Sequence, residues 1–135
     1  MTTKRGLGPV LIAGKRMPWG KGVIANGFVF LSGLDGSVDD QGRPVQGIEA
    51  QTIVALDRGE RYLREAGSSI GSAVRVIQYL ARAEDLAGFH ATRDAWFAEH
   101  AEDLMTEQSY AGVLVVQRFT NPDRLVELEV TAVLE

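Results

Sequence analysis

Apolar and polar positions follow two different periods along the chain, and each period predicts one kind of element. Asn26 and Gly27 separate two short apolar runs. A two-residue Asn-Gly loop in that position is typical of a β-hairpin, because both residues tolerate a positive φ. An earlier apolar run at residues 9–13 predicts another strand. Residues 33–46 are rich in Gly and Asp, so we expect a loop there.

Two segments have the helical period. Apolar side chains in residues 47–66 recur at spacings of three, four and seven, and Gly67 is placed to end this helix. Gly59 lies inside the same segment, where glycine is unfavourable, so we expect another element to pack closely against it. Residues 84–100 predict a second helix, with Trp96 on its apolar side.

Three further segments predict strands, at residues 73–80, 109–118 and 125–134. In the last of these, apolar residues alternate with Glu127 and Glu129. Because successive side chains of a strand point to opposite faces, Glu127 should lie on the face away from the core.

The predicted order β-β-β-α-β-α-β-β indicates an α+β domain that spans residues 1–135, with a mixed six-stranded sheet and two helices on one face. Several strands carry apolar residues on both faces. Two helices cannot cover both faces of such a sheet, so the uncovered face should contact another copy of the chain.

Composition narrows the class of protein. The net charge of −4 argues against a general nucleic-acid-binding protein. The absence of cysteine excludes disulfides, thiolate metal sites and thiol nucleophiles. No apolar run is long enough to cross a bilayer, and residues 1–5 do not lead into a secretory signal, so we expect a cytoplasmic protein without a membrane partner.

Spacing alone identifies no cofactor or metal site. His90 and Asp94 lie one helical turn apart, but no third ligand follows in register. The segment from Gly8 to Lys15 has the wrong spacing for a phosphate-binding loop. We therefore expect neither a metal nor a cofactor.

An ordered set of four segments is more informative than any single motif. Residues 25–33, 50–56, 63–67 and 125–132, taken in this order, closely resemble the Rid family, also called YjgF-like, which includes reactive-intermediate deaminases. The resemblance covers about residues 17–134. It implies a chorismate-mutase-like α+β sandwich, a homotrimer, and clefts between subunits that bind small carboxylate-bearing ligands.

The resemblance also implies a set of site residues. Trp19 stands where many members place a Tyr that lines the cleft, and Ser32 and Gly33 match a Ser-Gly pair that closes a strand. His90 occupies a position often filled by Asn. Glu127 matches the first Glu of a Val-Glu-Ile-Glu signature that orients a hydrolytic water, which makes it the candidate catalytic residue.

One departure from the family changes the expected chemistry. Deaminating members carry a Pro-Ala-Arg motif whose Arg binds the substrate carboxylate as a fork. Residues 104–111 contain no arginine here, and Glu107 or Gln108 takes that place. Tyr110 could still donate a hydrogen bond to a ligand. If a cation is needed, Arg93 is a candidate to supply it.

Two interpretations of function therefore remain open. The first is a trimeric protein that binds a small reactive metabolite and hydrolyses or isomerises an enamine or imine, without being a standard 2-imino-acid deaminase. The second is a non-catalytic ligand-binding or pathway-accessory protein, and an endoribonuclease fits the acidic charge least well. The candidate residues are Glu127 for catalysis and Trp19, Ser32, Gly33, His90, Gln108 and Tyr110 for ligand binding.

Overall fold

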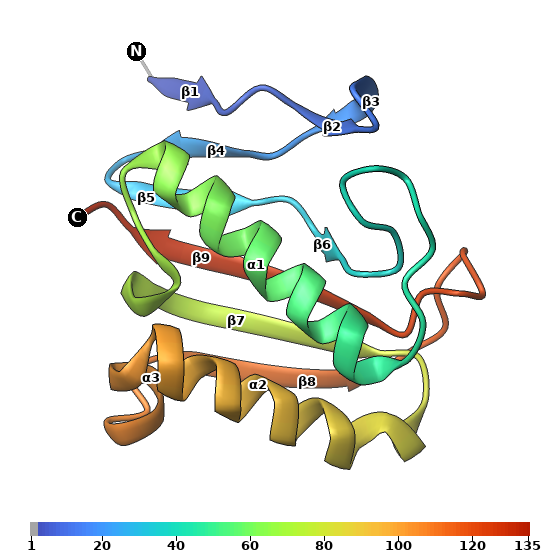
Figure 1. Ribbon diagram of the computed structural model, residues 1–135. Coiled ribbons are helices and arrows are strands. Elements are labelled where there is room, and N and C mark those ends of the chain that lie inside the picture. The colour runs from blue at the N-terminus through green and yellow to red at the C-terminus, as the bar shows by residue number, and fades with distance from the viewer. Residues whose placement is uncertain (1–2) are drawn as a thin grey trace.

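The protein has two layers, a mixed β-sheet and a set of helices that covers one face of the sheet (Figure 1). The computed structural model describes residues 3–135, so residues 1 and 2 of the N-terminal segment considered above lie outside it. Six strands run in the order β1-β4-β5-β9-β7-β8, and β6 pairs with β9 beside this path. Their bounds are β1 Lys4–Gly6, β4 Gly22–Ala25, β5 Phe28–Leu31, β6 Leu34–Asp35, β7 Ala73–Leu80, β8 Ala111–Val116 and β9 Val126–Val133. The α+β class is confirmed, but this sheet has seven strands rather than the six predicted.

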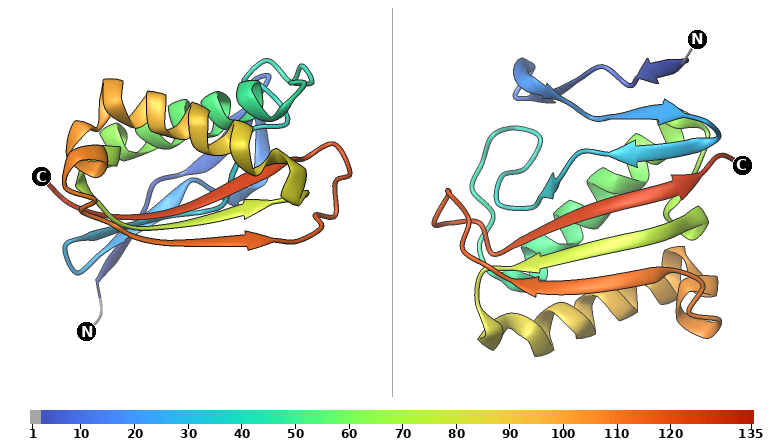
Figure 2. Two further views of the ribbon diagram at one scale, coloured as in Figure 1. Left: turned by 90° about the horizontal axis from the view of Figure 1, so that it is seen from below. Right: turned by 180° about the vertical axis from the view of Figure 1, so that it is seen from behind.

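Three helices, not two, lie on the covered face (Figure 2). They are α1 (Ile48–Ala66), α2 (Leu86–His100) and the short α3 (Glu102–Thr106). Two 3₁₀ turns, η1 (Ile70–Ser72) and η2 (Ala83–Asp85), precede β7 and α2. The third helix was missed because its five residues are too few to show a helical period. Among residues 3–135, no helix covers the other face, which we call the open face.

Local signals set the turns as predicted. Asn26 and Gly27 have φ values of 53° and 81° and join β4 to β5 in an antiparallel hairpin. Gly67 ends α1 in the left-handed conformation, with φ 87°, and its N–H donates to the carbonyl of Arg64 at 3.1 Å. Both glycines therefore occupy positions where a side chain would be strained.

The N-terminal segment differs from its prediction. The strand expected at residues 9–13 is β2 (Pro9–Ile12), and it pairs with a second strand, β3 (Lys15–Gly20), in a separate two-stranded sheet. Ala13 and Gly14 form the turn, with φ values of 52° and 74°. The sequence of β3 contains a proline and does not alternate, so no strand was predicted there. We call β2, β3 and their turn the β2–β3 hairpin.

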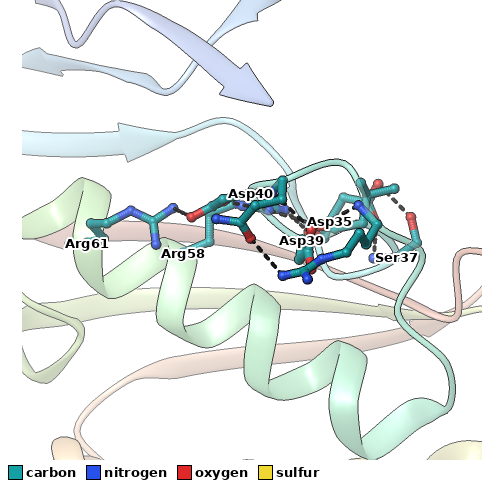
Figure 3. A network of polar contacts seen from close by, with 9 residues as sticks. Asp35, Ser37, Asp39, Asp40, Arg58 and Arg61 are labelled. Atoms are coloured by element: carbon teal, nitrogen blue, oxygen red, sulfur yellow. Dashed lines mark hydrogen bonds and ion pairs between the residues drawn. The ribbon is translucent and has the colours of Figure 1, made fainter. Parts of the chain in front are cut away.

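The loop after β5 is held against α1 by a buried arginine (Figure 3). Arg58 is only 6% exposed and donates hydrogen bonds to the carbonyls of Asp35 and Val38 and to the carboxylate of Asp40. Arg61, one turn further along α1, pairs with the other carboxylate oxygen of Asp40 at 2.9 Å. The predicted loop is therefore joined to α1 at Asp35, Val38 and Asp40, and β6 lies within it.

Gln51 joins this loop to the connection between β8 and β9. Its buried amide nitrogen donates to the carbonyls of Val45 and Asp123 at 3.0 and 2.9 Å, and its amide oxygen accepts a hydrogen bond from the N–H of Leu125. Two loops that are distant in sequence therefore meet at one end of the sheet, on the same side as the β2–β3 hairpin (Figure 1).

The core between the two layers follows the predicted alternation. The apolar positions of β9 are at most 1% exposed and pack in one cluster with the inner faces of α1 and α2. Gly59 lies where a Cβ would approach Leu34 to 2.7 Å, which confirms the close packing expected at this position. Trp96 is 6% exposed, donates from Nε1 to the carboxylate of Asp57 at 2.9 Å, and stacks 4.3 Å from the ring of His100.

The open face of the sheet carries large apolar side chains. Phe30 on β5 and Val113 on β8 are 43% and 41% exposed, respectively. Glu127 and Glu129 lie on the same face, because the alternate positions of β9 point into the core. Apolar surface that remains exposed on a sheet is typical of a face that another protein covers.

Candidate functional site

Glu127 is the second residue of β9 and lies at the end of the sheet where the two loops meet. It pairs across the strands with Asp35 of β6 on one side and with Tyr79 of β7 on the other. Its side chain is 28% exposed. The carboxylate therefore lies on the open face, as the alternation predicted, and is largely removed from water.

Gly33 makes the space for this carboxylate. A Cβ at Gly33 would lie 2.0 Å from Oε1 of Glu127, far inside van der Waals contact. Ser32, half-buried beside it, donates its backbone N–H to the carbonyl of Lys21. The structure thus brings Gly33 and Glu127 together, and Ser32 is adjacent to them.

Burial raises the pKa of Glu127 above its ordinary value of 4.5. The charge of Arg124 opposes this shift, whereas the carboxylates of Asp35 and Glu129 add to it. Desolvation disfavours the charged form of a carboxylate, so Glu127 binds a proton more readily than an exposed glutamate does.

Arg124 is a site residue that the sequence analysis missed. It precedes β9, and its guanidinium lies 3.1 Å from the carboxylate of Asp35 and 3.8 Å from that of Glu127. Two carboxylates side by side would repel each other, and the arginine between them offsets this repulsion. The available signal in the sequence was its position three residues before Glu127, just ahead of the same strand. We call Asp35, Arg124 and Glu127 the carboxylate cluster.

A cavity of about 270 Å³ opens beside this cluster within a single chain. We call it the hairpin pocket, because the β2–β3 hairpin forms part of its wall. It is lined by Val10, Ile12, Met17, Trp19, Gly33, Asp35, Val38, Arg58, Tyr62, Asn121 and Arg124. Trp19, which the resemblance placed in a ligand cleft, is therefore near Gly33 and the carboxylate cluster, and it is 53% exposed.

Gln108 and Tyr110 lie at the other end of the sheet. Both line a second cavity of about 260 Å³, next to α3 and the start of β8. Tyr79 pairs with Glu127 on one side and with Val115 on the other. Tyr110 is five residues before Val115, which corresponds to about 16 Å along the strand at roughly 3.3 Å per residue. Within one chain, the structure therefore does not bring Gln108 and Tyr110 to Glu127.

The other candidates are also separate from the carboxylate cluster. His90 is half-buried on α2, 5.8 Å from the ring of Phe89, and lines neither cavity. Arg93 donates to the side chain of Gln78 at 2.6 Å and pairs with Asp94 at 2.8 Å. Its charge is thus engaged between α2 and β7, and Arg124 is the cation that the structure places beside the predicted catalytic residue.

Across residues 3–135, no group of three or more His, Asp or Glu side chains is arranged to hold a metal ion. Of the helices described, none is both long enough and apolar enough to span a membrane.

Comparison with known proteins gives the family. A sequence profile described as endoribonuclease L-PSP matches residues 13–134. The chain belongs to this family. A YjgF-family protein of Neisseria meningitidis has the same fold, with 26% identity, a TM-score of 0.77, and coverage of 99% of this chain and 97% of that one. The Rid or YjgF membership implied by the resemblance is thereby confirmed.

Two other relatives extend the comparison. A RutC family protein of Aquifex aeolicus is 28% identical over 116 residues, which are 86% of this chain and 88% of the relative. The crystal structure of yeast Mmf1, at 24% identity, superposes with a TM-score of 0.81 over 98% of this chain and all of that one. The Rid fold thus spans nearly the whole chain, including the strands that carry the carboxylate cluster.

Proposed function

We propose that this Rid-family protein binds a small reactive metabolite of the enamine or imine type and hydrolyses or isomerises it, with Glu127 as the catalytic residue. The observation that carries the proposal is the carboxylate of Glu127, which is largely buried against Gly33 with a raised pKa, next to a cavity. A carboxylate whose pKa moves toward neutrality is a better general base than an exposed one.

The chemistry of imine hydrolysis assigns Glu127 two proton transfers. A water oxygen forms a bond to the imine carbon while Glu127 accepts a proton from that water and passes it to the nitrogen, which becomes an amine. Glu127 then accepts the hydroxyl proton as the carbonyl forms and the C–N bond breaks, and it gives this proton to the departing nitrogen, which leaves as ammonia. One water is consumed and one carbonyl compound and one ammonia are produced, so Glu127 ends as it began.

The proposal includes a homotrimer in the cytoplasm, with each site formed between two copies. Two observations support the assembly: exposed apolar side chains on the open face, and the separation of Tyr110 and Gln108 from Glu127 within one chain. A neighbouring copy could bring its own Tyr110 and Gln108 to Glu127, beside Ser32 and Trp19. His90 would contact the ligand from the same neighbouring copy.

A coupled assay tests the catalytic part of the proposal. Imines are generated from amino acids by an amino-acid oxidase, and their loss is followed with and without the protein. We expect Glu127→Gln to reduce turnover at least tenfold, and Gly33→Ala to do the same because it displaces the carboxylate without removing it. Glu129→Gln, exposed two residues further along the same face, is the matched control and should retain turnover.

The absence of arginine from residues 104–111 favours one alternative, binding without turnover. It also predicts weak hydrolysis of the smallest substrates, 2-iminopropanoate and 2-iminobutanoate. If a ligand binds in a way that depends on Glu127 but no imine is lost for any substrate, the catalytic proposal is wrong. The protein would then have a ligand-binding or pathway-accessory role. Equal turnover in Glu127→Gln and the unmodified protein would remove Glu127 from the mechanism.

A further inference from the structure

A third cavity lies between α1 and α2, on the surface of the helix layer (Figure 1). We call it the α1–α2 groove. Its volume is about 600 Å³, within the roughly 300–1,000 Å³ of typical small-molecule sites. Among residues 3–135, none lines both this groove and the hairpin pocket, so the two are separate sites. The lining that matters here is Ile53 and Asp57 of α1 and Ala91, Ala95, Trp96 and Glu99 of α2.

Small side chains on α2 leave the groove open. Ala91 and Ala95 lie one helical turn apart and are both exposed. Ile53 lines the groove from α1 and is 44% exposed. Within the part of the chain that the structure describes, Leu86 is the one other large apolar side chain of these two helices that is exposed. This apolar surface is too small for a protein interface, which buries about 800 Å² on each partner, so its size favours a small molecule.

The polar wall of the groove is negatively charged. Oδ1 of Asp57 accepts a hydrogen bond from Nε1 of Trp96 at 2.9 Å, which fixes the direction of the carboxylate. Oδ2 of Asp57 accepts no hydrogen bond from residues 3–135 and is available to a ligand. Glu99 lines the same groove with a side chain that is 78% exposed, and it lies 3.7 Å from His100, which is a cation only when protonated.

The cations near the groove are engaged elsewhere. Arg61 follows Asp57 by one helical turn, but it pairs with Asp40 at 2.9 Å. Arg93 of α2 pairs with Asp94 at 2.8 Å. The groove therefore presents two carboxylates that no lysine or arginine among residues 3–135 neutralises. A positively charged ligand is complementary to such a wall.

We propose that the α1–α2 groove binds a protonated amine with an apolar body, such as an arylalkylamine. The ammonium group donates to Oδ2 of Asp57 and is attracted by the charge of Glu99. An ammonium carries three N–H donors, so it can meet both carboxylates at once. The apolar body packs against Ile53, Ala91 and Ala95. This binding site is independent of the carboxylate cluster and goes beyond the proposed function.

Calorimetric titration of the full-length protein with three probes tests the inference. 2-Phenylethylamine has both the charge and the ring, 2-phenylethanol has the ring without the charge, and ethylamine has the charge without the ring. We expect 2-phenylethylamine to bind about fivefold to tenfold more tightly than either of the others, because a charged hydrogen bond and the burial of apolar surface each contribute. Equal affinity for the amine and the alcohol would overturn the inference.

Variants of the lining test the contacts. Asp57→Asn keeps an acceptor for Trp96 but removes the charge, and Glu99→Gln removes the second charge. Each should weaken 2-phenylethylamine by up to about fivefold, the range of exposed ion pairs. Asp103→Asn, exposed on α3 and outside the lining, removes the same charge and is the matched control. If Asp57→Asn and Glu99→Gln both match Asp103→Asn, the groove does not bind the ammonium.

Two further variants locate the bound amine. Ala95→Leu fills the groove and should weaken both 2-phenylethylamine and 2-phenylethanol. Glu127→Gln should leave their affinities unchanged, because Glu127 does not line the groove. Amine binding that is lost in Glu127→Gln but kept in Ala95→Leu would place the amine at the carboxylate cluster and overturn the inference. Binding of a basic amphipathic peptide, with no binding of the amine, would overturn it in favour of a surface for a protein partner.

Discussion

The absence of a side chain at Gly33 affects the protonation of Glu127. The space that a Cβ would fill at Gly33 is occupied by the carboxylate of Glu127, and this position removes the carboxylate from much of the solvent. The positive charge of Arg124 stabilises the ionised carboxylate of Glu127 and so offsets part of the loss of solvation. The balance of these effects leaves the pKa raised, so the charged form of Glu127 opposes folding.

We therefore predict that Glu127→Gln does not destabilise the protein above neutral pH. Because burial raises the pKa of Glu127, the folded protein keeps a proton that the unfolded chain releases near pH 4.5. This contribution to stability is present below that pH and is lost as the pH rises through the folded pKa. Thermal melts from about pH 4 to about pH 8 should show the midpoint of Glu127→Gln rising relative to the unmodified protein as the pH increases. A midpoint that falls instead would show that Arg124 outweighs burial.

Arg58 and Arg61 offer a matched pair, because both bind the carboxylate of Asp40. Arg58→Ala removes three hydrogen bonds from a buried side chain and should lower the free energy of unfolding by about 2–3 kcal/mol, at about 1 kcal/mol per bond. Arg61 is exposed, so Arg61→Ala should cost less than about 1 kcal/mol. Urea denaturation of the two variants measures the difference, and equal losses would contradict the anchoring role of Arg58.

The contact between α1 and the loop after β5 depends on a second glycine. A Cβ at Gly36 would lie 1.9 Å from the backbone oxygen of Gln51, so the loop and the helix approach each other more closely than any side chain allows. We predict that Gly36→Ala lowers the free energy of unfolding by about 1–3 kcal/mol through overpacking. Gly6→Ala is the control, since nothing lies within 4 Å of its Cβ position. Hydrogen exchange should also show faster opening of the loop in Gly36→Ala alone.

Elements with a strong local signal were predictable from the sequence. The Asn26-Gly27 hairpin, the end of α1 at Gly67 and the strand at residues 73–80 each depend on a turn residue or on regular alternation, and the structure confirms them. The second helix begins after a 3₁₀ turn, and β8 and β9 are shorter than predicted by a few residues. The strands β1, β3 and β6 depend on partners elsewhere in the chain, so local pattern could not reveal them.

Part of the candidate site was predictable, either from the alternation of apolar and polar residues or from the family resemblance. Alternation placed Glu127 opposite the core, and resemblance pointed to Gly33 and Trp19, which the fold brings near it. Arg58 and Arg124 act through contacts between separate loops, and such contacts have no periodic signature. Their roles became visible only when the two loops were seen to meet at the end of the sheet.

Across the whole molecule, the open face leads to a prediction about assembly. Sedimentation equilibrium should give about three times the chain mass of 14.7 kDa, because the exposed apolar residues need a second protein surface to cover them and the proposed assembly is a homotrimer. Phe30→Lys places a charge on the open face and should dissociate the assembly. Ile53→Lys, similarly exposed but on α1 in the helix layer, should not. A monomer at micromolar concentration would contradict both the assembly and the shared site.

The two tryptophans of the chain differ in solvent exposure, because Trp96 is buried and Trp19 is exposed. Their intrinsic fluorescence can therefore report on two separate parts of the protein. Trp96 is enclosed by Asp57 and the ring of His100, so its emission will shift only when the helix layer separates from the sheet. Trp19 is open to solvent at the hairpin pocket, so a collisional quencher such as iodide will reach it first. Replacing Trp96 with phenylalanine leaves a single indole whose emission will report occupancy of the pocket, while replacing Trp19 leaves one that reports unfolding. Binding and unfolding can thus be followed separately by fluorescence without any attached dye.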